Sequence, residues 1–235
     1  MQYVGGKARS ASWLRTTIEP LLKGQYAYLE PFFGGGNSFE ALSSLCPERV
    51  VGDVDENVTA LWWAVAKGWV PPTVVTPEEY QALKKSPVSP LRSFVGFGCS
   101  FGGKWFAGYS ANKRGDDFCG ASRRAVLRLA PLLSGVTIKR AHYRHWQPAR
   151  GWLVYCDPPY AGTQGYGRSF DGLKFWDTCR KWACQGALVV VSEYHAPKDF
   201  VCIAERPRRK TLSKQDDNTD SVTERLFMYK TGETQ

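Results

Sequence analysis

The chain has 235 residues, of which 43% are hydrophobic and 23% are charged, and its formal net charge is +9. This length is enough for one large domain, or for one domain with a sizeable insertion. No apolar run reaches a membrane-spanning length, and seven cysteines without a CxxC pair argue against both a disulfide framework and a zinc site. We therefore expect a protein of the reducing cytoplasm, without a signal segment, a membrane partner or a metal.

The positive charge is concentrated in the middle of the chain. Between residues 91 and 150 there are eleven Lys and Arg against two Asp, and this segment accounts for the whole excess. Aromatic residues are interleaved with the basic ones, which predicts a surface that binds a polyanion. A solvated basic face is the alternative. The candidate contacts are Lys104, Trp105, Tyr109, Lys113, Arg114, Arg123 and Arg124.

The first elements in chain order are a helix, a strand and a second helix. The helix is predicted over residues 10–22 and the strand over 27–29. The strand runs into Glu30-Pro31-Phe32-Phe33-Gly34-Gly35-Gly36-Asn37, and the second helix covers 38–45. A strand, a glycine-rich turn and a helix in this order bring the backbone close to a ligand at a helix N-terminus. The turn alone is weak evidence, because dinucleotide sites, S-adenosylmethionine sites and many plain turns share it.

The next strand covers residues 49–52 and ends in Asp53-Val54-Asp55. An acid about twenty residues after a glycine turn, at the tip of the second strand, is placed to accept hydrogen bonds from ribose hydroxyls. Asp53 is the better placed of the two acids. A helix over 57–65 follows, and its tryptophans are expected in the core.

The middle of the chain differs in composition. Five prolines lie between residues 71 and 90, and Thr76-Pro77-Glu78-Glu79 predicts a short capped helix. Residues 91–119 are too rich in glycine for a long helix, so we interpret them as a hairpin and loop that carry the basic surface. A helix is predicted over 121–133 and a strand over 135–141.

The tetrapeptide Asp157-Pro158-Pro159-Tyr160 follows an apolar strand at residues 152–156. It is therefore expected where a strand leaves the sheet, which is where open α/β sheets bind ligands. The two prolines fix φ and remove two backbone donors, which leaves rigid carbonyl acceptors. A carboxylate, a bare carbonyl and the flat ring of Tyr160 suit a planar group with an exocyclic amine, such as a nucleobase. An ordinary turn at the end of a strand is the alternative.

The last part of the chain predicts the rest of the sheet. A polar, glycine-rich loop at 161–167 is either a lid or a passive connection, and Phe170 follows it. One helix and three strands are predicted, at residues 173–184, 187–194, 200–205 and 224–230. The loop between the last two strands is a second candidate contact for phosphate, through Arg208, Arg209 and Lys210.

Five segments occur in one order: Tyr3-Val4-Gly5-Gly6-Lys7, EPFFGGG at 30–36, GDVDENV at 52–58, YCDPPY at 155–160 and VVVSEYHAP at 189–197. In this order, with the basic segment between GDVDENV and YCDPPY, they resemble the Dam-like (alpha group) adenine-N6 DNA methyltransferases over nearly the whole length. The resemblance implies a class I methyltransferase fold, which is an α/β fold with a Rossmann-like mixed sheet and helices on both faces. It also implies S-adenosylmethionine as methyl donor and a small inserted target-recognition domain.

The resemblance further implies where each function lies. The catalytic domain is expected at residues 1–63 and 141–235, and the target-recognition domain at 64–140. Catalysis is expected from Asp157, Pro158 and Tyr160. The expected cofactor-binding residues are Tyr3, Lys7, Glu30, Phe33, Gly34, Gly36, Asn37, Asp53, Val54, Asp157 and Phe170. The expected partner is double-stranded DNA, bound by a monomer in a bacterial cell, with a bacterial or phage source.

The expected chemistry needs no metal and no covalent intermediate. Hydrogen bonds from the two protons of the adenine amine to Asp157 and to the Pro158 carbonyl would favour a pyramidal nitrogen with a localised lone pair. That nitrogen attacks the sulfonium methyl in line, so catalysis is mostly positioning and charge placement. The base must first leave the duplex, and Tyr160 can stack on its face.

Three alternatives remain open. The acceptor turn would also serve methylation of RNA or of a protein glutamine, although those families more often begin the motif with Asn and lack the central insertion. A DNA-binding protein with an inactive methyltransferase fold is disfavoured by the intact Asp53, Asp157 and glycine turn. A nicotinamide-dependent oxidoreductase is least favoured, because the sequence has no turn with GxGxxG spacing.

Overall fold

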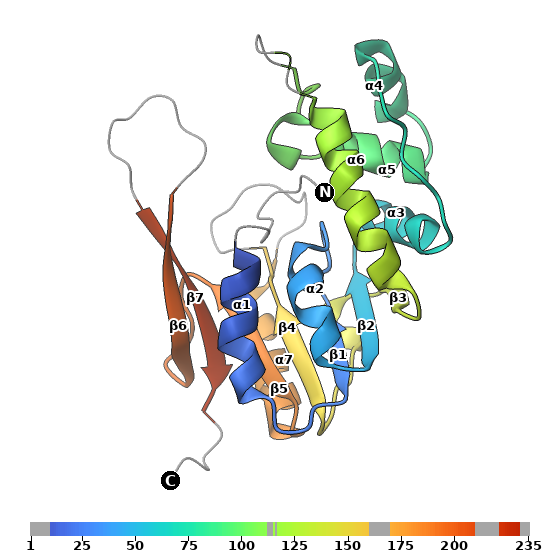
Figure 1. Cartoon of the computed structure of the whole chain (residues 1–235). Coiled ribbons are helices and arrows are strands. Elements are labelled where there is room, and N and C mark those ends of the chain that lie inside the picture. The colour runs from blue at the N-terminus through green and yellow to red at the C-terminus, as the bar shows by residue number, and fades with distance from the viewer. Residues whose placement is uncertain (1–9, 112–114, 116, 160–169, 210–220, 231–235) are drawn as a thin grey trace.

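A seven-stranded mixed β-sheet organises the chain, as the computed structural model in Figure 1 shows. The structure describes residues 10–111, 115, 117–159, 170–209 and 221–230. The strands lie in the order β3-β2-β1-β4-β5-β7-β6, and β7 runs antiparallel to both of its neighbours, β5 and β6. Their bounds are β1 Ala27–Glu30, β2 Glu48–Asp53, β3 Thr137–Arg140, β4 Trp152–Cys156, β5 Leu188–Glu193, β6 Phe200–Arg209 and β7 Ser221–Tyr229. The predicted mixed sheet is confirmed.

The strand order reverses at β1. From β1 the sheet continues to β2 and β3 on one side and to β4 and β5 on the other. The register places Leu29 of β1 beside Val50 of β2 and Val154 of β4. Because these strands are parallel, their carboxyl ends lie at one edge of the sheet, and such a reversal point is where α/β proteins bind ligands.

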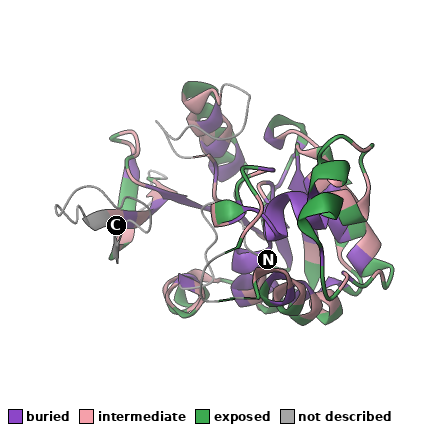
Figure 2. Cartoon of the chain, turned by 90° about the horizontal axis from the view of Figure 1, so that it is seen from above, coloured by how far each residue is buried: buried purple, intermediate pink, exposed green. Residues whose placement is uncertain are grey.

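Helices cover both faces of the sheet. One face is covered by α1 (Ala11–Ile18), α2 (Asn37–Leu42) and α3 (Glu56–Ala66). The other face is covered by α7 (Gly172–Cys184). Along β4, Leu153 and Tyr155 join the first hydrophobic core, whereas Val154 and Cys156 join the second. In Figure 2 the strands are mostly buried and the surrounding helices turn exposed faces outward. Of the helices described, none is long and apolar enough to cross a membrane.

The hairpin and loop predicted for residues 91–119 are wrong at their start. Residues Pro90–Gly98 form helix α5, which Ser89 caps with its side chain and which begins with a proline. A turn closed by a bridge between Ser100 and Tyr109 follows the helix, so the hairpin-like part of the prediction is found at residues 100–109. Two of the glycines that argued against a helix, Gly96 and Gly98, lie in α5 and have a packing role.

Gly96 shows why glycine occurs in this helix. A Cβ at this position would lie 2.3 Å from the ring of Trp105 and 2.7 Å from that of Phe106. We expect Gly96→Ala to lower the free energy of unfolding by about 1–3 kcal/mol, because the rings would have to move within a packed region. Gly172→Ala is the control, since nothing lies within 4 Å of its Cβ, and it should change the unfolding free energy by less than about 0.5 kcal/mol. Urea denaturation measures both, and equal stability of the two variants would contradict this account of the packing.

The segment between α3 and β3 is helical and rises beyond the carboxyl ends of the parallel strands (Figure 1). It contains α4 (Pro77–Lys84) with the predicted capping box at its start, then α5 and α6 (Phe118–Leu129). Near the expected boundaries at residues 64 and 140, α3 continues to Ala66, and β3 pairs with β2 in the main sheet. The division into domains at these residues, and target recognition by the segment between them, stay predictions.

The basic stretch predicted as a loop after residue 205 belongs largely to a strand. Residues 206–209 extend β6, because they pair with residues 221–224 of β7. Lys210 lies outside the described residues, so the contact with phosphate predicted for this stretch stays a prediction.

Candidate functional site

Three acidic side chains meet at the carboxyl edge of the sheet. Glu30 ends β1, Asp53 ends β2 and Asp157 directly follows β4. β1 lies between the other two strands, so the three acids come together at the point where the strand order reverses. The charges of Asp157 and Asp53 both act on Glu30. This edge is thus acidic, although the chain as a whole carries a net charge of +9.

The glycine-rich turn after β1 is held from two sides. The N–H of Gly34 donates to Asp53 Oδ2 (3.0 Å), and the indole N–H of Trp62 donates to the carbonyl of Gly34 (2.8 Å). Gly36 has a φ of +72°, in the left-handed region that favours glycine. Asn37 then starts α2 and is buried. Trp62 is in the core as expected, but Trp63 is not: it is 42% exposed, and its indole N–H donates to the carbonyl of Ile138 (2.8 Å). The hydrogen bond from Trp62 to the turn is a role that the sequence pattern does not reveal.

Asp53 is nearly buried and accepts two backbone hydrogen bonds. Its Oδ1 accepts from the N–H of Asp55 (2.9 Å) and its Oδ2 from that of Gly34. Burial raises the pKa of Asp53 to about 6. Each carboxylate oxygen can accept a further hydrogen bond, so the predicted contact with ribose hydroxyls stays open. The structure adds a second role, which is to fix the turn. The neighbouring Val54 is exposed at the same strand end.

Glu30 lies behind the glycine turn. Its side chain is fully buried and accepts hydrogen bonds from the hydroxyls of Tyr28 (2.7 Å) and Ser38. The bond from Ser38 ties α2 to β1. Burial raises the pKa of Glu30 to about 8, and the charges of Asp157 and Asp53 act in the same direction. This geometry favours a positioning role for Glu30 over the direct contact with a cofactor predicted for it.

The buried carboxyl of Glu30 should make the protein less stable as the pH rises. Its pKa is raised from 4.5 to about 8 on folding, so the folded protein keeps a proton that the unfolded chain releases. The resulting stability is complete below about pH 4.5 and is lost towards about pH 8, in an amount on the order of 4 kcal/mol. In Glu30→Gln this loss should disappear. The smaller fall in stability that comes from the raised pKa of Asp53 should remain. Urea denaturation at about pH 5 and about pH 8 measures the difference, and an unchanged pH dependence would show that Glu30 is ionised in the folded chain.

The predicted acceptor turn begins where β4 leaves the sheet. Cys156, the last residue of β4, is fully buried; Asp157 is half-buried and Pro158 is buried. Asp157 and Pro158 thus lie at the same edge of the sheet as Asp53, as the motif order predicts. Three other residues expected at the site lie outside the described residues, and they are Tyr3, Lys7 and Tyr160.

The two consecutive phenylalanines after β1 take different surroundings. Phe33, predicted to contact the cofactor, is buried and packs against Trp62 with 5.4 Å between ring centroids. Phe32 is half-buried and lies 6.0 Å from Phe170 and 5.6 Å from Tyr143 between ring centroids. Phe32 is therefore an aromatic residue near the site that the sequence reasoning missed. The available signal was that neighbouring side chains in an extended segment point to opposite sides.

Lys104 and Arg124 are the predicted nucleic-acid contacts that the structure shows exposed. Arg124 lies in α6, 3.4 Å from a carboxylate oxygen of Asp117, in an ion pair that is exposed on both sides. Such exposed pairs are weak and leave the guanidinium able to exchange partners. Five further candidates have side chains outside the described part of the chain: Lys113, Arg114, Arg208, Arg209 and Lys210.

Three other predicted contacts take part in packing within the insertion. The ring of Trp105 packs against the guanidinium of Arg92, with 4.9 Å between the ring centroid and the guanidinium carbon. The hydroxyl of Tyr109 donates to the carbonyl of Val75 (2.7 Å). Arg123 is half-buried and donates to a backbone carbonyl in the segment before α4 (3.0 Å). These side chains stabilise the insertion, and contact between them and nucleic acid stays a prediction.

Several solved structures are similar to this chain in fold. A proposed RNA methyltransferase from Pyrococcus horikoshii is 10% identical with a TM-score of 0.47, covering 94% of this chain and 82% of its own. An rRNA methylase from Streptococcus thermophilus is 12% identical with a TM-score of 0.42, covering 93% and 95%. An S-adenosylmethionine-dependent methyltransferase from Agrobacterium tumefaciens is 11% identical with a TM-score of 0.43, covering 95% and 61%. No protein-family model and no curated protein matches the sequence. The function proposed below therefore rests on the residues of the site.

Proposed function

We propose that this chain is an S-adenosylmethionine-dependent methyltransferase that acts on the exocyclic N6 amine of adenine in DNA. The observation that carries this proposal is the meeting of Asp53, Asp157 and the glycine turn at the carboxyl edge of β2, β1 and β4. In open α/β sheets, ligands bind outside the carboxyl ends of the strands where the strand order reverses. The two acids and the Pro158 carbonyl supply the hydrogen-bond acceptors of such a site.

The chemistry of the donor set fits this cofactor. S-adenosylmethionine carries ribose hydroxyls and positive charge, and when bound it supplies a methyl group activated by a sulfonium. Asp53 can accept hydrogen bonds from the hydroxyls, and the acidic edge of the sheet attracts the positive charge. Glu30 adds little charge to this edge, because burial raises its pKa to about 8 and the carboxyl keeps its proton near neutral pH.

Asp157 and Pro158 provide the acceptors for the target amine. The carboxylate and the carbonyl can each accept one of its two protons, which favours a nitrogen with an available lone pair. When the amine takes up the methyl group, the C–S bond of the donor would break and leave a neutral thioether, and Asp157 or solvent would accept one proton from the nitrogen. The chain contributes orientation and charge placement to this step, with no covalent bond to the protein.

The choice of DNA rests on the helical insertion. It rises beyond the carboxyl edge of the sheet (Figure 1), and it carries the exposed cations Lys104 and Arg124. A duplex held by these cations could present an extruded base to the acceptor turn. RNA is the second candidate, because an unpaired base would meet the same acceptors without having to leave a duplex.

Incubation of the protein with methyl-labelled S-adenosylmethionine tests the proposal. Plasmid DNA and ribosomal RNA are supplied in parallel, and the labelled nucleosides are identified by mass spectrometry. We expect label in DNA as N6-methyladenine. Label in RNA alone would overturn the choice of DNA but keep the methyltransferase. Failure to bind the methyl donor in calorimetry, together with no label in either nucleic acid, would overturn the methyltransferase itself.

The salt dependence of DNA binding tests the basic surface separately. The double variant Lys104→Ala/Arg124→Ala should bind DNA more weakly, and the slope of log K against log salt should fall by about 2, because two phosphate contacts are lost. Lys23→Ala/Arg150→Ala removes the same charge from exposed residues that precede β1 and β4, at the opposite edge of the sheet. This control should keep the wild-type slope. If both double variants give one slope, the insertion is not the DNA surface.

A further inference from the structure

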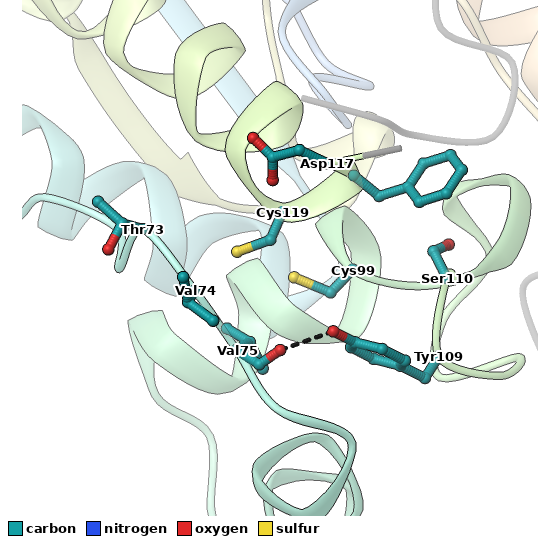
Figure 3. A pocket seen from close by; sticks show the side chains of 9 residues that line it. Thr73, Val74, Val75, Cys99, Tyr109, Ser110, Asp117 and Cys119 are labelled. Carbon is teal, nitrogen blue, oxygen red and sulfur yellow. Dashed lines mark hydrogen bonds between the residues drawn. The ribbon is translucent and has the colours of Figure 1, made fainter. Parts of the chain in front are cut away.

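Cys99 and Cys119 meet inside the helical insertion. Cys99 directly follows α5 as its C-cap, and Cys119 is the second residue of α6. Both line a cavity of about 100 Å³, and Figure 3 shows the two side chains next to each other with their sulfur atoms on the same side. The two thiols interact through a hydrogen bond. All seven cysteines of the chain are free thiols, so this pair is reduced in the structure.

The two thiols differ in reactivity. The hydrogen bond from Cys99 lowers the pKa of the Cys119 thiol, and the same bond raises the pKa of the Cys99 thiol. Arg123, one turn further along α6, also lowers the pKa of Cys119, whereas burial, Asp117 and Glu79 oppose this shift. A thiol near a helix N-terminus with a cation beside it has the surroundings of a reactive cysteine.

Cys119 is the member of the pair that solvent reaches first. Cys99 is 1% exposed, whereas Cys119 is half-buried. The rim of the cavity includes the exposed residues Thr73, Val74 and Asp117, and Val74 is 70% exposed. A small reagent that enters the cavity therefore meets the more acidic thiol first and has the second thiol behind it.

We propose that this cavity is a thiol–disulfide exchange site, at which a low-molecular-weight disulfide such as oxidised glutathione converts Cys99 and Cys119 into a disulfide. The Cys119 thiolate attacks one sulfur of the small disulfide, and the other sulfur leaves as a thiolate that takes up a proton. Cys99 then loses its proton to solvent and attacks Cys119 Sγ, which releases the second small thiol. Two protein thiols are oxidised, and one small disulfide is reduced to two thiols.

This site goes beyond the proposed methyl transfer, but it acts on the same insertion. The disulfide joins the end of α5 to the start of α6, across the turn that holds Lys104. Arg124 lies one turn beyond the junction in α6. The redox state of the pair thus governs how freely the two exposed cations move relative to each other.

Mass spectrometry of the oxidised protein tests the proposal. The variant Cys184→Ser/Cys202→Ser removes the two exposed thiols, and it is treated with oxidised glutathione, alkylated and digested with trypsin. We expect peptides 93–104 and 115–123 to be joined by a disulfide. Adding Cys99→Ser should stop the reaction at a glutathione adduct on Cys119. Adding Cys119→Ser should leave Cys99 alkylatable.

The pair Cys156 and Cys179 is the internal control. These thiols also interact with each other, but both are fully buried in the core, and they should stay reduced. The proposal is overturned if Cys119 remains a free thiol at oxidant concentrations that convert Cys184 and Cys202 of the wild-type chain into mixed disulfides. It is also overturned if Cys99→Ser traps no adduct. These readouts are masses, so they are independent of methyl transfer.

Discussion

Asp157→Ala is expected to slow methyl transfer by about a thousandfold, because the variant loses the carboxylate that accepts a proton of the target amine and stabilises the positive charge developing on its nitrogen. Asp157 lies at the end of β4 and is half-buried, so its removal should leave the core intact. Affinity for nucleic acid should stay within severalfold of wild type. The rate is measured as label transferred from the methyl donor in a single turnover.

Asp157→Asn separates charge from shape at this position. An amide oxygen can still accept one proton of the amine, so this variant should keep measurable activity and lie between wild type and Asp157→Ala. Full activity in Asp157→Ala would remove the proposed role of the acceptor turn. Equal loss in both variants, with donor binding unchanged, would show that the negative charge alone matters.

Asp53→Ala is expected to abolish detectable binding of S-adenosylmethionine. Two effects add: the acceptor proposed for the ribose hydroxyls is lost, and the N–H groups of Gly34 and Asp55 lose their partner. Each buried donor left without an acceptor costs about 1–3 kcal/mol, so the turn should loosen and the free energy of unfolding should fall by a few kcal/mol. Calorimetric titration with the donor and urea denaturation measure the two effects.

Glu56→Ala is the matched control for Asp53→Ala. It removes an acid three residues away, at the start of α3, whose exposed side chain pairs with Arg140 at 2.9 Å. Exposed pairs contribute about 0–1 kcal/mol, so stability should hardly change, and donor binding should be retained. If both variants bind the donor as the wild type does, Asp53 serves the turn alone.

Local sequence patterns were sufficient for most of the sheet and for the positions of its acids. The apolar runs at residues 152–156 and 187–194 could be recognised as strands because they are short and uninterrupted, and both are strands in the structure. Asp53 and Asp157 could be placed at strand ends because each follows directly on such a run. Their meeting could be anticipated because carboxyl ends of parallel strands share an edge. The roles of these residues in binding and catalysis stay predictions.

The helix α5 shows where a local pattern fails. Glycine is a poor helix former in isolation, and on that ground the sequence predicts a hairpin and loop over residues 91–119. In the folded chain the ring of Trp105 occupies the space next to Gly96. The packing of Trp105 against Gly96 outweighs the low helix propensity of glycine. The information that decides this helix is therefore a contact and not a propensity.

By itself the sequence determined the mixed α/β sheet, the glycine turn and the acids at the strand ends, because burial and turn chemistry leave a local periodic trace. The tertiary structure alone decided that Phe33 faces the core while Phe32 faces Phe170, that Arg123 packs within the insertion, and that Cys99 meets Cys119. These are pairings between segments distant in the chain. A local pattern records that a side chain is buried or charged, but the partner that it meets is set by how the elements pack.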